Sequence, residues 1–591
     1  MSKITDLIYP EEAIHLPGLF CERVRRTPNK IAYQYFKDSE QQWNSYTWQE
    51  VQDKVASIQH SLLKLNLDAG QSVAIMANNC PEWMMFEQAS LGLGLVVVPL
   101  YPNDRADNVS YIINDAEVQA VLVAGDEQCK LFENIKQETK SIKIIISLQQ
   151  QAKNTNKTID FQSWINTTQQ SKYILEKIKP NQLASIVYTS GTTGRPKGVM
   201  LSHNNILHNA YGASQCESFF PTDTFLSFLP LSHMFERTVG YYLPMLSGAQ
   251  VTYARSIEDL AEDLLSIKPT ILVTVPRIFE RVYNKIHLQL LDKPKFAQIL
   301  FNTTVDVGWH WFRYSQNKTQ WHPKLLLRPV LHNIVASKIL KKLGGNLRLA
   351  ISGGAALSPD IARVFIGLGL NISQGYGMTE LSPVVCTNLL HDNEPDSVGQ
   401  KLINVDVKLG DNEELLVKGP SVMLGYLHNK EATENIIDKD GWLHTGDKAR
   451  IRNDHIYITG RIKDVLVLST GEKIPPNDIE LSITNDPLFD QAIIYGEGKS
   501  FLSAITVLNI DEWNKCCSDL KINSTQANEF ILNRIKKCLH DFPGYARIYK
   551  IYCTTDGWTV ENGLSTPTLK LKRKYIIQKY QDEINAMYEG H

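Results

Sequence analysis

The most constraining feature of this chain is the segment 184–200, ASIVYTSGTTGRPKGVM. Its apolar start, 185–188, predicts a short buried strand. The next ten residues, 189–198, contain four hydroxyl side chains, three glycines and two cations. Glycines let a backbone approach a polyphosphate closely, while hydroxyls and cations supply hydrogen-bond donors and positive charge. An ordinary strand-to-helix turn needs fewer such residues, so we interpret the segment as a phosphate-binding loop.

This loop differs from the P-loop of the nucleoside triphosphatases. The P-loop pattern requires Gly-Lys followed by Ser or Thr, whereas here Gly198 follows Lys197. The remaining parts of a nucleotide site therefore have to be sought elsewhere in the chain.

Composition bounds the class of protein. The 591 residues are 43% hydrophobic, which is enough for large cores and more than one domain. The net charge of −2 gives no global field that would attract nucleic acid or anionic lipid. Nine scattered cysteines without metal-binding spacing suit a reducing compartment. The start lacks a signal-peptide pattern and no apolar run reaches ~18 residues, so we expect a cytoplasmic protein, at most peripheral to a membrane.

Several segments before and after the loop predict an α/β fold. Residues 47–50, TWQE, form a capping box ahead of a helical apolar repeat. Strand and helix patterns then alternate, which indicates a parallel sheet with helices on both faces. The polar segment 149–171 is interpreted as a surface connection. Further on, we expect residues 276–281 to form a turn between a strand and a helix.

Two glycine-containing segments downstream suit a nucleotide. Gly353-Gly354 follows an expected strand, and a glycine pair there lets a flat ring lie against the backbone, although a turn alone would also explain it. In the segment 375–380, GYGMTE, Tyr376 can stack on adenine and Thr379 can donate to a phosphate. Glu380 is a hard oxygen ligand suited to Mg²⁺.

Three further candidates are ambiguous when taken alone. His233, in the segment 231–237, either helps wall a substrate pocket or is a hydrogen-bonded core histidine. Asp447, at the end of DGWLHTGD, either accepts from a ribose diol or closes an Asx turn. Lys570 lies in a cationic run, usually a solvated face, but Thr566-Pro567 fixes the loop just before it.

The region 285–343 is expected to be helical and combines tryptophans with several basic residues. Packing of these helices on their own domain is the simpler interpretation. Contact with a membrane interface is the alternative, because aromatic and basic side chains are typical of such surfaces.

The order of these motifs resembles the adenylate-forming superfamily, and in detail the long-chain fatty acyl-CoA synthetases with an extended helical insert. This resemblance implies a large N-terminal α/β domain with mixed or parallel sheets, residues 1–460, with the insert at 285–343. A hinge at 461–464 and a small mobile α+β cap at 465–591 complete it. The implied reaction has two steps: a fatty carboxylate attacks Mg·ATP to give acyl-AMP and pyrophosphate, and CoA then takes the acyl group and releases AMP.

The resemblance also implies site residues. It implies that the phosphates are bound by Thr189, Ser190, Gly191, Thr192, Thr193, Gly194 and Lys197. Adenine and ribose would be bound by Gly353, Gly354, Ala355, Gly375, Tyr376, Gly377, Thr379, Asp447 and Arg461. CoA would be bound by Ser469, Gly471, Glu472 and Lys473, the acyl pocket would include His233 and Phe235, and Mg²⁺ would be bound by Thr192 and Glu380. The implied catalytic residues are Lys570, Thr192 and Glu380. Lys463 occupies the hinge, where some relatives have Asp.

Two rival functions follow from the same residues. A fatty acyl-AMP ligase would pass the acyl group to a carrier protein, although no fused carrier domain is visible. A non-catalytic, nucleotide-gated lipid-binding or membrane protein would tolerate loss of Lys570 or Glu380, and both are present. Acyl chain length, a homodimer and a peripheral membrane contact are left open by the sequence.

Overall fold

The computed structural model describes residues 5–149, 157–165, 172–189, 195–291, 293–462, 466–469, 472–474, 476–520, 524–540, 542, 546–566 and 570–589. The chain divides into two compact units. Unit 1 comprises residues 1–408, 416–444 and 451–457, and unit 2 comprises 409–415, 445–450 and 458–591. Among the described helices, none has the length and apolar character that crossing a bilayer requires.

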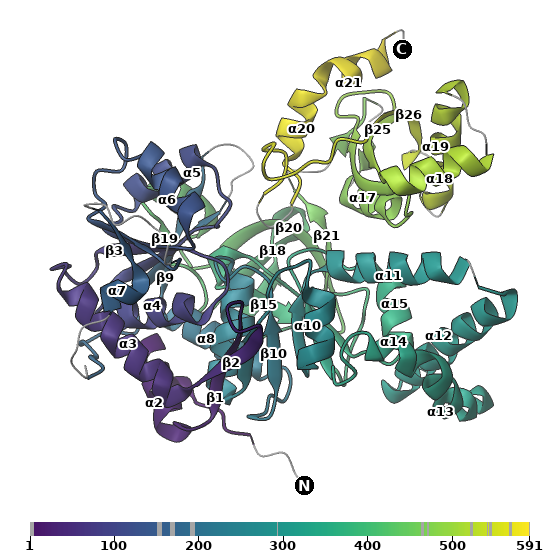
Figure 1. Ribbon diagram of the computed structural model, residues 1–591. Coiled ribbons are helices and arrows are strands. Elements are labelled where there is room, and N and C mark those ends of the chain that lie inside the picture. The colour runs from purple at the N-terminus through teal and green to yellow at the C-terminus, as the bar shows by residue number, and fades with distance from the viewer. Residues whose placement is uncertain are drawn as a thin grey trace. The chain divides into compact units, whose positions relative to one another are not determined.

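Unit 1 contains a sheet whose described strands run in the order β16-β15-β14-β13-β12-β10-β11-β1-β2. Figure 1 labels β1, β2, β10 and β15 of this sheet. Its strands are β1 (Ile31–Lys37), β2 (Gln42–Thr47), β10 (Thr224–Ser227), β11 (Gln250–Tyr253), β12 (Ile271–Thr274), β13 (Leu349–Ser352), β14 (Ile372–Gly377), β15 (Val384–Thr387) and β16 (Gln400–Lys401). The six neighbours from β14 to β1 are parallel. Strands β2, β15 and β16 join antiparallel at the two sides.

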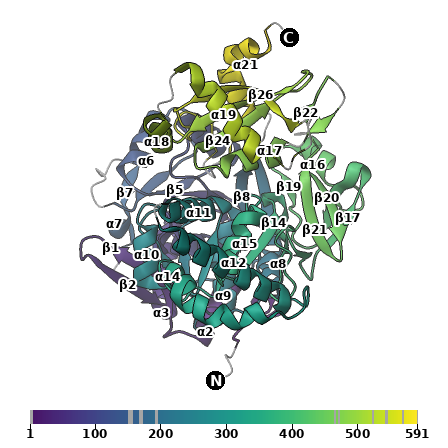
Figure 2. The same cartoon turned by 90° about the vertical axis from the view of Figure 1, so that its right-hand side faces the viewer.

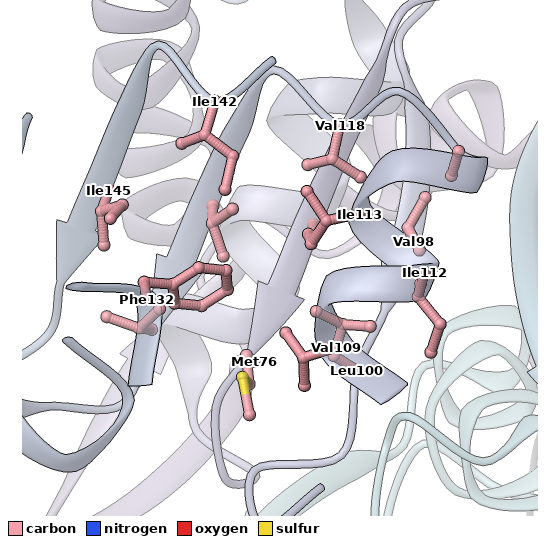
Figure 3. Close-up of a cluster of buried hydrophobic side chains, with 14 of the residues drawn as sticks. Met76, Val98, Leu100, Val109, Ile112, Ile113, Val118, Phe132, Ile142 and Ile145 are labelled. Atoms are coloured by element: carbon pink, nitrogen blue, oxygen red, sulfur yellow. The ribbon is translucent and has the colours of Figure 1, made fainter. Parts of the chain in front are cut away.

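The second sheet of unit 1 has the order β19-β9-β8-β4-β3-β5-β6-β7. Its strands are β3 (Ser72–Met76), β4 (Val96–Pro99), β5 (Ala120–Val123), β6 (Ile144–Ser147), β7 (Thr158–Asp160), β8 (Leu183–Thr189), β9 (Lys197–Ser202) and β19 (Gly425–Tyr426). Every residue of β3, β4 and β5 is buried, as expected for parallel strands covered on both faces. Figure 3 shows one core of this sheet, where Val109 lies beside Met76; Ile112 and Ile113 belong to the same cluster of buried side chains.

The helices that cover these sheets include α2 (Leu16–Arg26), α3 (Trp48–Leu63), α4 (Pro81–Gly92), α5 (Ala106–Asp115), α6 (Asp126–Asn134), α8 (His203–Ser214), α9 (Leu243–Ser247), α10 (Leu260–Ile267) and α15 (Pro359–Gly367). Among them, α2, α3 and α8 begin at a side chain that caps the first turn, namely His15, Thr47 and Ser202. The capping box predicted for α3 is confirmed. Thr47 N–H donates to Glu50 Oε2 over 2.7 Å, and Glu50 N–H donates to Thr47 Oγ1 over 3.3 Å.

Two local predictions were wrong. Residues 276–281 form no turn, because α11 (Pro276–Leu291) begins at Pro276 itself. Proline is well suited to the first turn of a helix, where its missing N–H would be unbonded in any case. The segment 149–171 is not simply a surface connection. Its described middle forms β7 and α7 (Phe161–Ile165), whose Trp164 is buried while its carbonyl accepts from Ser61 Oγ over 2.8 Å.

The helical insert, residues 285–343, begins within α11 and belongs to unit 1. After α11 it continues with α12 (Lys295–Ser315), the 3₁₀ turn η2 (Pro323–Leu327), α13 (Arg328–Leu331), the π-helical turn η3 (His332–Ala336) and α14 (Ser337–Lys341). Val307 of α12 packs with Leu325 and Leu331 in one small core. Figure 2 shows α11, α12 and α14 facing the viewer.

A further sheet, β17-β18-β20-β21, has segments in both units. Its strands are β17 (Asp406–Leu409), β18 (Glu414–Lys418), β20 (Leu443–Arg452) and β21 (His455–Arg461).

Unit 2 is built on a sheet with helices on both faces. The strands β24 (Phe489–Tyr495), β25 (Leu502–Leu508) and β26 (Ile548–Thr554) lie side by side, with β24 antiparallel and β26 parallel to β25. Ala504 belongs to the core that includes residues of α17 (Pro476–Thr484) and α19 (Ser524–Cys538). The next residue, Ile505, belongs to the opposite core, with α20 (Arg573–Lys579) and α21 (Gln581–Tyr588). This alternation is the period of two that a strand covered on both faces requires.

Candidate active site

The expected adenine-binding segments of unit 1 leave the same edge of one sheet. Strands β10, β12, β13 and β14 are parallel neighbours, so their carboxyl ends lie together. Gly353 follows β13, Tyr376 lies near the end of β14, and the segment with Phe235 follows β10. Ligands of open α/β sheets bind outside the carboxyl ends of the strands. The topology therefore brings together residues that are far apart in the sequence.

Gly353 contacts the ring of Phe235 so closely that a side chain at this position would require the ring to move. A Cβ at position 353 would lie 2.8 Å from Phe235 Cζ. Gly354, next along the chain, has φ of +81°, a conformation that favours glycine. The following turn is tied to β14, because Leu357 N–H donates to Gln374 Oε1 over 3.2 Å. The glycine pair and the expected acyl-pocket segment thus form one packed surface.

The glycines on either side of Tyr376 have a local structural reason. A Cβ at Gly377 would lie 1.9 Å from the Pro383 carbonyl oxygen, and one at Gly375 would lie 2.9 Å from the Cys386 carbonyl oxygen. Both contacts arise because β15 returns antiparallel to β14. The two glycines therefore allow β15 to lie this close to β14. Tyr376, which is half-buried between them, is the only one of these three residues with a side chain that can contact a ring.

The flanks of the phosphate-binding loop form an antiparallel hairpin. Strand β8 ends at Thr189 and β9 begins at Lys197, and these two residues are paired. Arg195 lies 5.1 Å from the ring centre of Tyr111. Residues 190–194, which carry the predicted Ser190, Gly191, Thr192, Thr193 and Gly194, lie outside the described part of the structure.

Glu380 and Lys197 are joined through one aromatic side chain, Tyr426 of β19. Tyr426 donates its hydroxyl hydrogen to Glu380 Oε1 over 2.8 Å, and Lys197 Nζ lies 4.8 Å from the Tyr426 ring centre. Burial raises the pKa of Tyr426 far above its usual value, and the adjacent Glu380 carboxylate raises it further. Tyr426 therefore remains a hydrogen-bond donor at any physiological pH.

The turn that carries Thr379 and Glu380 is anchored by a buried asparagine. This turn is η4 (Thr379–Leu381). The side chain of Asn209, on α8, makes three hydrogen bonds to the backbone at the end of this turn and just after it. Asn209 Nδ2 donates to the Leu381 and Val384 carbonyl oxygens over 3.1 and 2.7 Å, and Asn209 Oδ1 accepts from Val384 N–H over 3.0 Å. Asn209 thereby positions a segment more than 170 residues away in the sequence.

His233 and its neighbours lie in a partly buried segment. His233 is half-buried, and its Nδ1 accepts from Phe235 N–H over 3.2 Å. Arg237 is fully buried, where it pairs with Glu87 of α4 and donates to Ser185 Oγ of β8 over 2.8 Å. This arginine connects the strand before the phosphate loop to the segment with His233.

Asp447 and Arg461 lie in unit 2 and form an ion pair. Arg461 Nε donates to Asp447 Oδ1 over 2.9 Å, with Asp447 buried and Arg461 half-exposed. Thr445 Oγ1 accepts from Asp447 N–H over 3.1 Å, which is the geometry of a local turn. The Thr445 hydroxyl, rather than the Asp447 carboxylate, makes this turn, and the Asp447 carboxylate accepts from Arg461, 14 residues further along the chain.

The expected CoA-side residues also lie in unit 2. Short strands β22 (Leu466–Val467) and β23 (Lys473–Ile474) pair antiparallel, with Val467 opposite Lys473. Between them Ser469 is exposed, and Leu468 N–H donates to the Glu472 carbonyl oxygen over 3.0 Å. Gly471 and the expected hinge residue Lys463 lie outside the described residues.

Lys570 is exposed at the end of a closed turn of unit 2. Thr566 N–H donates to the Lys570 carbonyl oxygen over 2.8 Å, and Lys570 N–H donates to Thr566 Oγ1 over 3.0 Å. A bridge between Ser565 and Leu571 closes the same turn. The Thr566 hydroxyl thus fixes the backbone from which the Lys570 side chain extends.

Sequence reasoning missed Tyr426 and Asn209. Neither lies within a recognisable motif, because each acts on Glu380 or its turn from a distant part of the chain. A tyrosine at the end of a short strand and an asparagine within a helix carry no signal of their own. Only the pairing of β19 with β9 brings Tyr426 beside the phosphate loop.

These features define a class of protein with an adenylate-forming fold, in which a large α/β unit carries the segments 184–200 and 375–380 and a smaller unit follows it. A solved structure with this fold is the anthranilate CoA ligase AuaEII in complex with anthranoyl-AMP. It aligns with a TM-score of 0.75 over 97% of this chain and 98% of that chain, at 19% identity.

The chain belongs to the AMP-binding enzyme family. The family model matches residues 20–427, and the model of the AMP-binding enzyme C-terminal domain matches residues 463–591. The long-chain-fatty-acid–CoA ligase FadD15 of Mycobacterium bovis is 28% identical over 97% of each chain. The long-chain-fatty-acid–[acyl-carrier-protein] ligase AEE15 of Arabidopsis thaliana, a chloroplastic protein, is 27% identical over 92% of this chain and 82% of that protein.

Proposed function

We propose that this protein is an AMP-forming long-chain fatty acid–CoA ligase that acts in the cytoplasm. In the first step an oxygen of the fatty carboxylate bonds to the α-phosphorus of ATP, and pyrophosphate leaves. In the second, the CoA thiolate attacks the acyl carbon of the adenylate, and AMP leaves. The substrates are thus a fatty acid, ATP and CoA.

The observation that carries this proposal is the Lys197–Tyr426–Glu380 arrangement. A cation on one strand of the phosphate hairpin and a buried carboxylate are held by the same tyrosine. The first step brings a carboxylate against a polyphosphate, so the site has to neutralise negative charge and hold the reactants in line. A phosphate-side cation and a carboxylate suited to a metal meet this need.

The described residues fit Mg²⁺ that is bound together with the nucleotide. In the part of the chain that the structure describes, no cluster of three or more His, Cys, Asp and Glu side chains could hold a metal alone. Mg²⁺ is commonly bound by one or two carboxylates together with substrate phosphates. We propose Glu380 and the Thr192 hydroxyl as its protein ligands, and the ion supplies charge neutralisation to the phosphates when bound.

Further roles rest on the sequence resemblance. We propose that residues 1–460 bind ATP and the fatty acid, and that a cap at 465–591 moves about Lys463 in the hinge 461–464. Lys570 neutralises the pair formed by the attacking carboxylate and the α-phosphate. Asp447 and Arg461 bind the ribose, and the segment with Ser469, Glu472 and Lys473 faces CoA. The preformed Arg461–Asp447 ion pair supports the ribose assignment, because it orients the carboxylate that a diol needs.

A second acceptor is supported by one observation. A relative that is 27% identical over 92% of this chain is named an acyl-carrier-protein ligase. The alternative is therefore transfer of the acyl group to the phosphopantetheine thiol of a carrier protein. CoA and such a carrier present the same reacting thiol, so they are distinguished by measurement of the acceptor.

The test is pyrophosphate release from Mg·ATP by the purified protein with fatty acids of increasing length. Each acid is assayed alone, with CoA and with a phosphopantetheine-loaded carrier protein, and the thioester product is quantified. We expect acyl-CoA with an optimum at long chains. Pyrophosphate with acyl-carrier but no acyl-CoA would support the carrier-protein ligase, and no turnover on any acid would overturn both proposals.

A further inference from the structure

The helical insert exposes an unusual share of the apolar surface of this protein. Of the 24 large apolar or aromatic side chains that are exposed in the described residues, ten lie between positions 291 and 334. They are Leu291, Phe296, Ile299, Trp311, Tyr314, Trp321, Leu326, Leu327, Val330 and Ile334, which we call the insert face. Single exposed apolar residues are ordinary, but a concentration of this kind indicates an interaction surface.

The run from η2 to α14 is apolar on two sides. Its inner side chains Leu325, Leu331 and Ala336 are buried against α12 and its neighbours. On its outer side, Leu326, Val330 and Ile334 follow one another at a spacing of four residues and are 72%, 56% and 47% exposed. A helix that only packs on its own domain would carry polar residues on that outer stripe. The outer stripe therefore has no function in the core.

The aromatic residues of α12 are also divided between a buried side and an exposed side of the helix. Trp309 and Phe312 pack against a core that includes Phe365 of α15, as the simpler interpretation of the sequence expects. Trp311 and Tyr314, on another side of the same helix, remain 37% exposed. Packing on the domain thus accounts for half of this aromatic pattern.

The insert is also strongly basic. Residues 285–343 contain ten lysines and arginines and two aspartates, a net charge of +8 in a chain whose total is −2. Lys318 is neutralised by Asp392 and Glu394, at 3.3 and 2.9 Å. Among the residues that the structure describes, no acidic side chain pairs with Lys295, Lys324 or Lys338. Their positive charge is therefore available to a partner.

One cation of the insert is held by an aromatic ring. The Arg328 guanidinium carbon lies 4.5 Å from the Trp311 ring centre, a cation–π geometry. Both side chains line a cavity of about 130 Å³, together with Gln316, His332 and Asn371. No carboxylate within the described part of unit 1 pairs with Arg328. This oriented cation can meet a phosphate group without losing an existing ion pair.

We propose that the insert face docks on the surface of a membrane that contains anionic phospholipids. The outer apolar side chains enter the headgroup region, and the lysines and Arg328 contact lipid phosphates. Apolar and aromatic side chains flanked by cations, without a spanning helix, are the combination that lies in the plane of a bilayer interface. The opposite charge of the insert and of anionic lipid selects this partner over a second copy of the chain, whose insert would be equally positive.

The test is flotation of the full-length protein with vesicles. One set contains equal parts of phosphatidylcholine and phosphatidylglycerol, and the other contains phosphatidylcholine alone. We expect binding to the anionic vesicles at least tenfold tighter than to the neutral ones, and loss of most of this difference in 1 M salt, because salt screens exposed charges. Binding is measured without ATP or fatty acid, so failure of the proposed catalytic function leaves this result interpretable.

Two variants separate the apolar and the charged contributions. L326S/V330S/I334S removes the outer stripe, and K295E/K338E reverses two unpaired charges. Each is expected to weaken binding to anionic vesicles at least tenfold. The matched control is I257S/L265S/I403S, which removes three side chains that are 48%, 51% and 65% exposed elsewhere in unit 1. This control is expected to bind like the unmodified protein, and circular dichroism checks that every variant is folded.

Three outcomes would overturn the proposal. These are no flotation with anionic vesicles, equal flotation with neutral ones, or wild-type flotation by both insert variants. Sedimentation equilibrium is run in parallel. A concentration-dependent dimer that L326S/V330S/I334S abolishes, without vesicle binding, would assign the insert face to a second copy instead.

Discussion

The Tyr426 hydroxyl lies 2.8 Å from Glu380 Oε1, and the same tyrosine ring lies under the Lys197 ammonium. One side chain on a two-residue strand therefore orients a carboxylate and a cation that the sequence places 183 residues apart. Its phenol remains protonated because burial and the carboxylate both raise its pKa. Tyr426 is thus a positioning residue for Glu380 and Lys197 in the proposed phosphate site.

Substitution Y426F tests this role. A hydrogen bond to a charged group contributes about 1.5–3 kcal/mol, so we expect a loss of roughly 10- to 100-fold in kcat/KM for Mg·ATP. The dependence of the rate on Mg²⁺ concentration should shift to higher concentrations, which a purely structural defect would not cause. Y35F, which removes a 3.0 Å hydrogen bond to Tyr46 far from these residues in the sequence, is the control. Equal effects of Y426F and Y35F would contradict the assignment.

Substitution K570A separates the two half-reactions. Because Lys570 is proposed to neutralise the attacking carboxylate and the α-phosphate, we expect adenylate formation to fall by at least 100-fold. Thioester formation from supplied acyl-AMP should stay within a few fold of the wild-type rate. K574A removes an exposed cation of the same run and should leave both steps intact. Equal loss of both half-reactions in K570A would exclude the proposed role.

Substitution K463P tests the proposed hinge. Proline fixes φ and removes a backbone N–H, so a position that has to rotate between the two steps should become locked. We expect the CoA-dependent step to slow more than pyrophosphate release. Rapid-quench measurement of acyl-AMP should then reveal its accumulation in the variant. If both steps slow by the same factor, Lys463 is not the pivot.

Substitution G353A tests the contact between the glycine pair and Phe235. The new Cβ would lie 2.8 Å from Phe235 Cζ, so the ring has to move. We expect a higher KM for the fatty acid and partial recovery in G353A/F235L, since leucine vacates the ring volume. A control is G557A, where the nearest neighbour of a Cβ is 3.8 Å away. Additive effects of G353A and F235L would show that the two positions act independently.

Glu236 predicts a pH dependence of stability. Burial raises its pKa to about 8 in the folded chain, against 4.5 ordinarily, although the hydrogen bond from Ser227 Oγ opposes this. Between these values the unfolded chain ionises while the folded chain holds the proton. Stability therefore falls as pH rises from 4.5 to 8, with a maximal slope of about 1.4 kcal/mol per pH unit.

Substitution E236Q should remove this dependence. From pH 5.5 to 7.5 the variant should gain on the order of 2 kcal/mol relative to the wild type. The thermal midpoint at the two pH values measures the change. E431Q, on the exposed start of α16 (Lys430–Ile436), should follow the wild type. Parallel pH curves for the wild type and E236Q would contradict a protonated, buried Glu236.

The sequence predicts most of the strand and helix order, because its signals are local. The capping box at Thr47 and Glu50 and the buried run of β3 depend only on neighbouring residues. The start of α11 at Pro276 was missed because proline is compatible with both a turn and a first helical turn. The Trp164 carbonyl oxygen accepts from Ser61, which lies about a hundred residues away, so no local pattern could reveal this contact.

For the candidate site, local motifs predict which residues take part, whereas their contact partners depend on tertiary pairing between distant segments. Glu380 is found from the GYGMTE motif, but its partner Tyr426 is not. Gly377 illustrates the opposite case: the motif suggests a nucleotide contact, whereas the structure gives it a packing reason beside Pro383. The sequence also leaves the environment of Arg328 open, since only the fold places it over Trp311.

The hairpin that flanks the phosphate loop has one further consequence. In a P-loop the phosphates meet the first turn of a helix, whose aligned peptide dipoles supply a fixed positive potential. Here β9 follows the loop, and α8 begins only at His203. Antiparallel strands have opposed dipoles and so contribute little net macrodipole. Nucleotide affinity in this protein should therefore vary with divalent cation and ionic strength more steeply than in a helix-capped site.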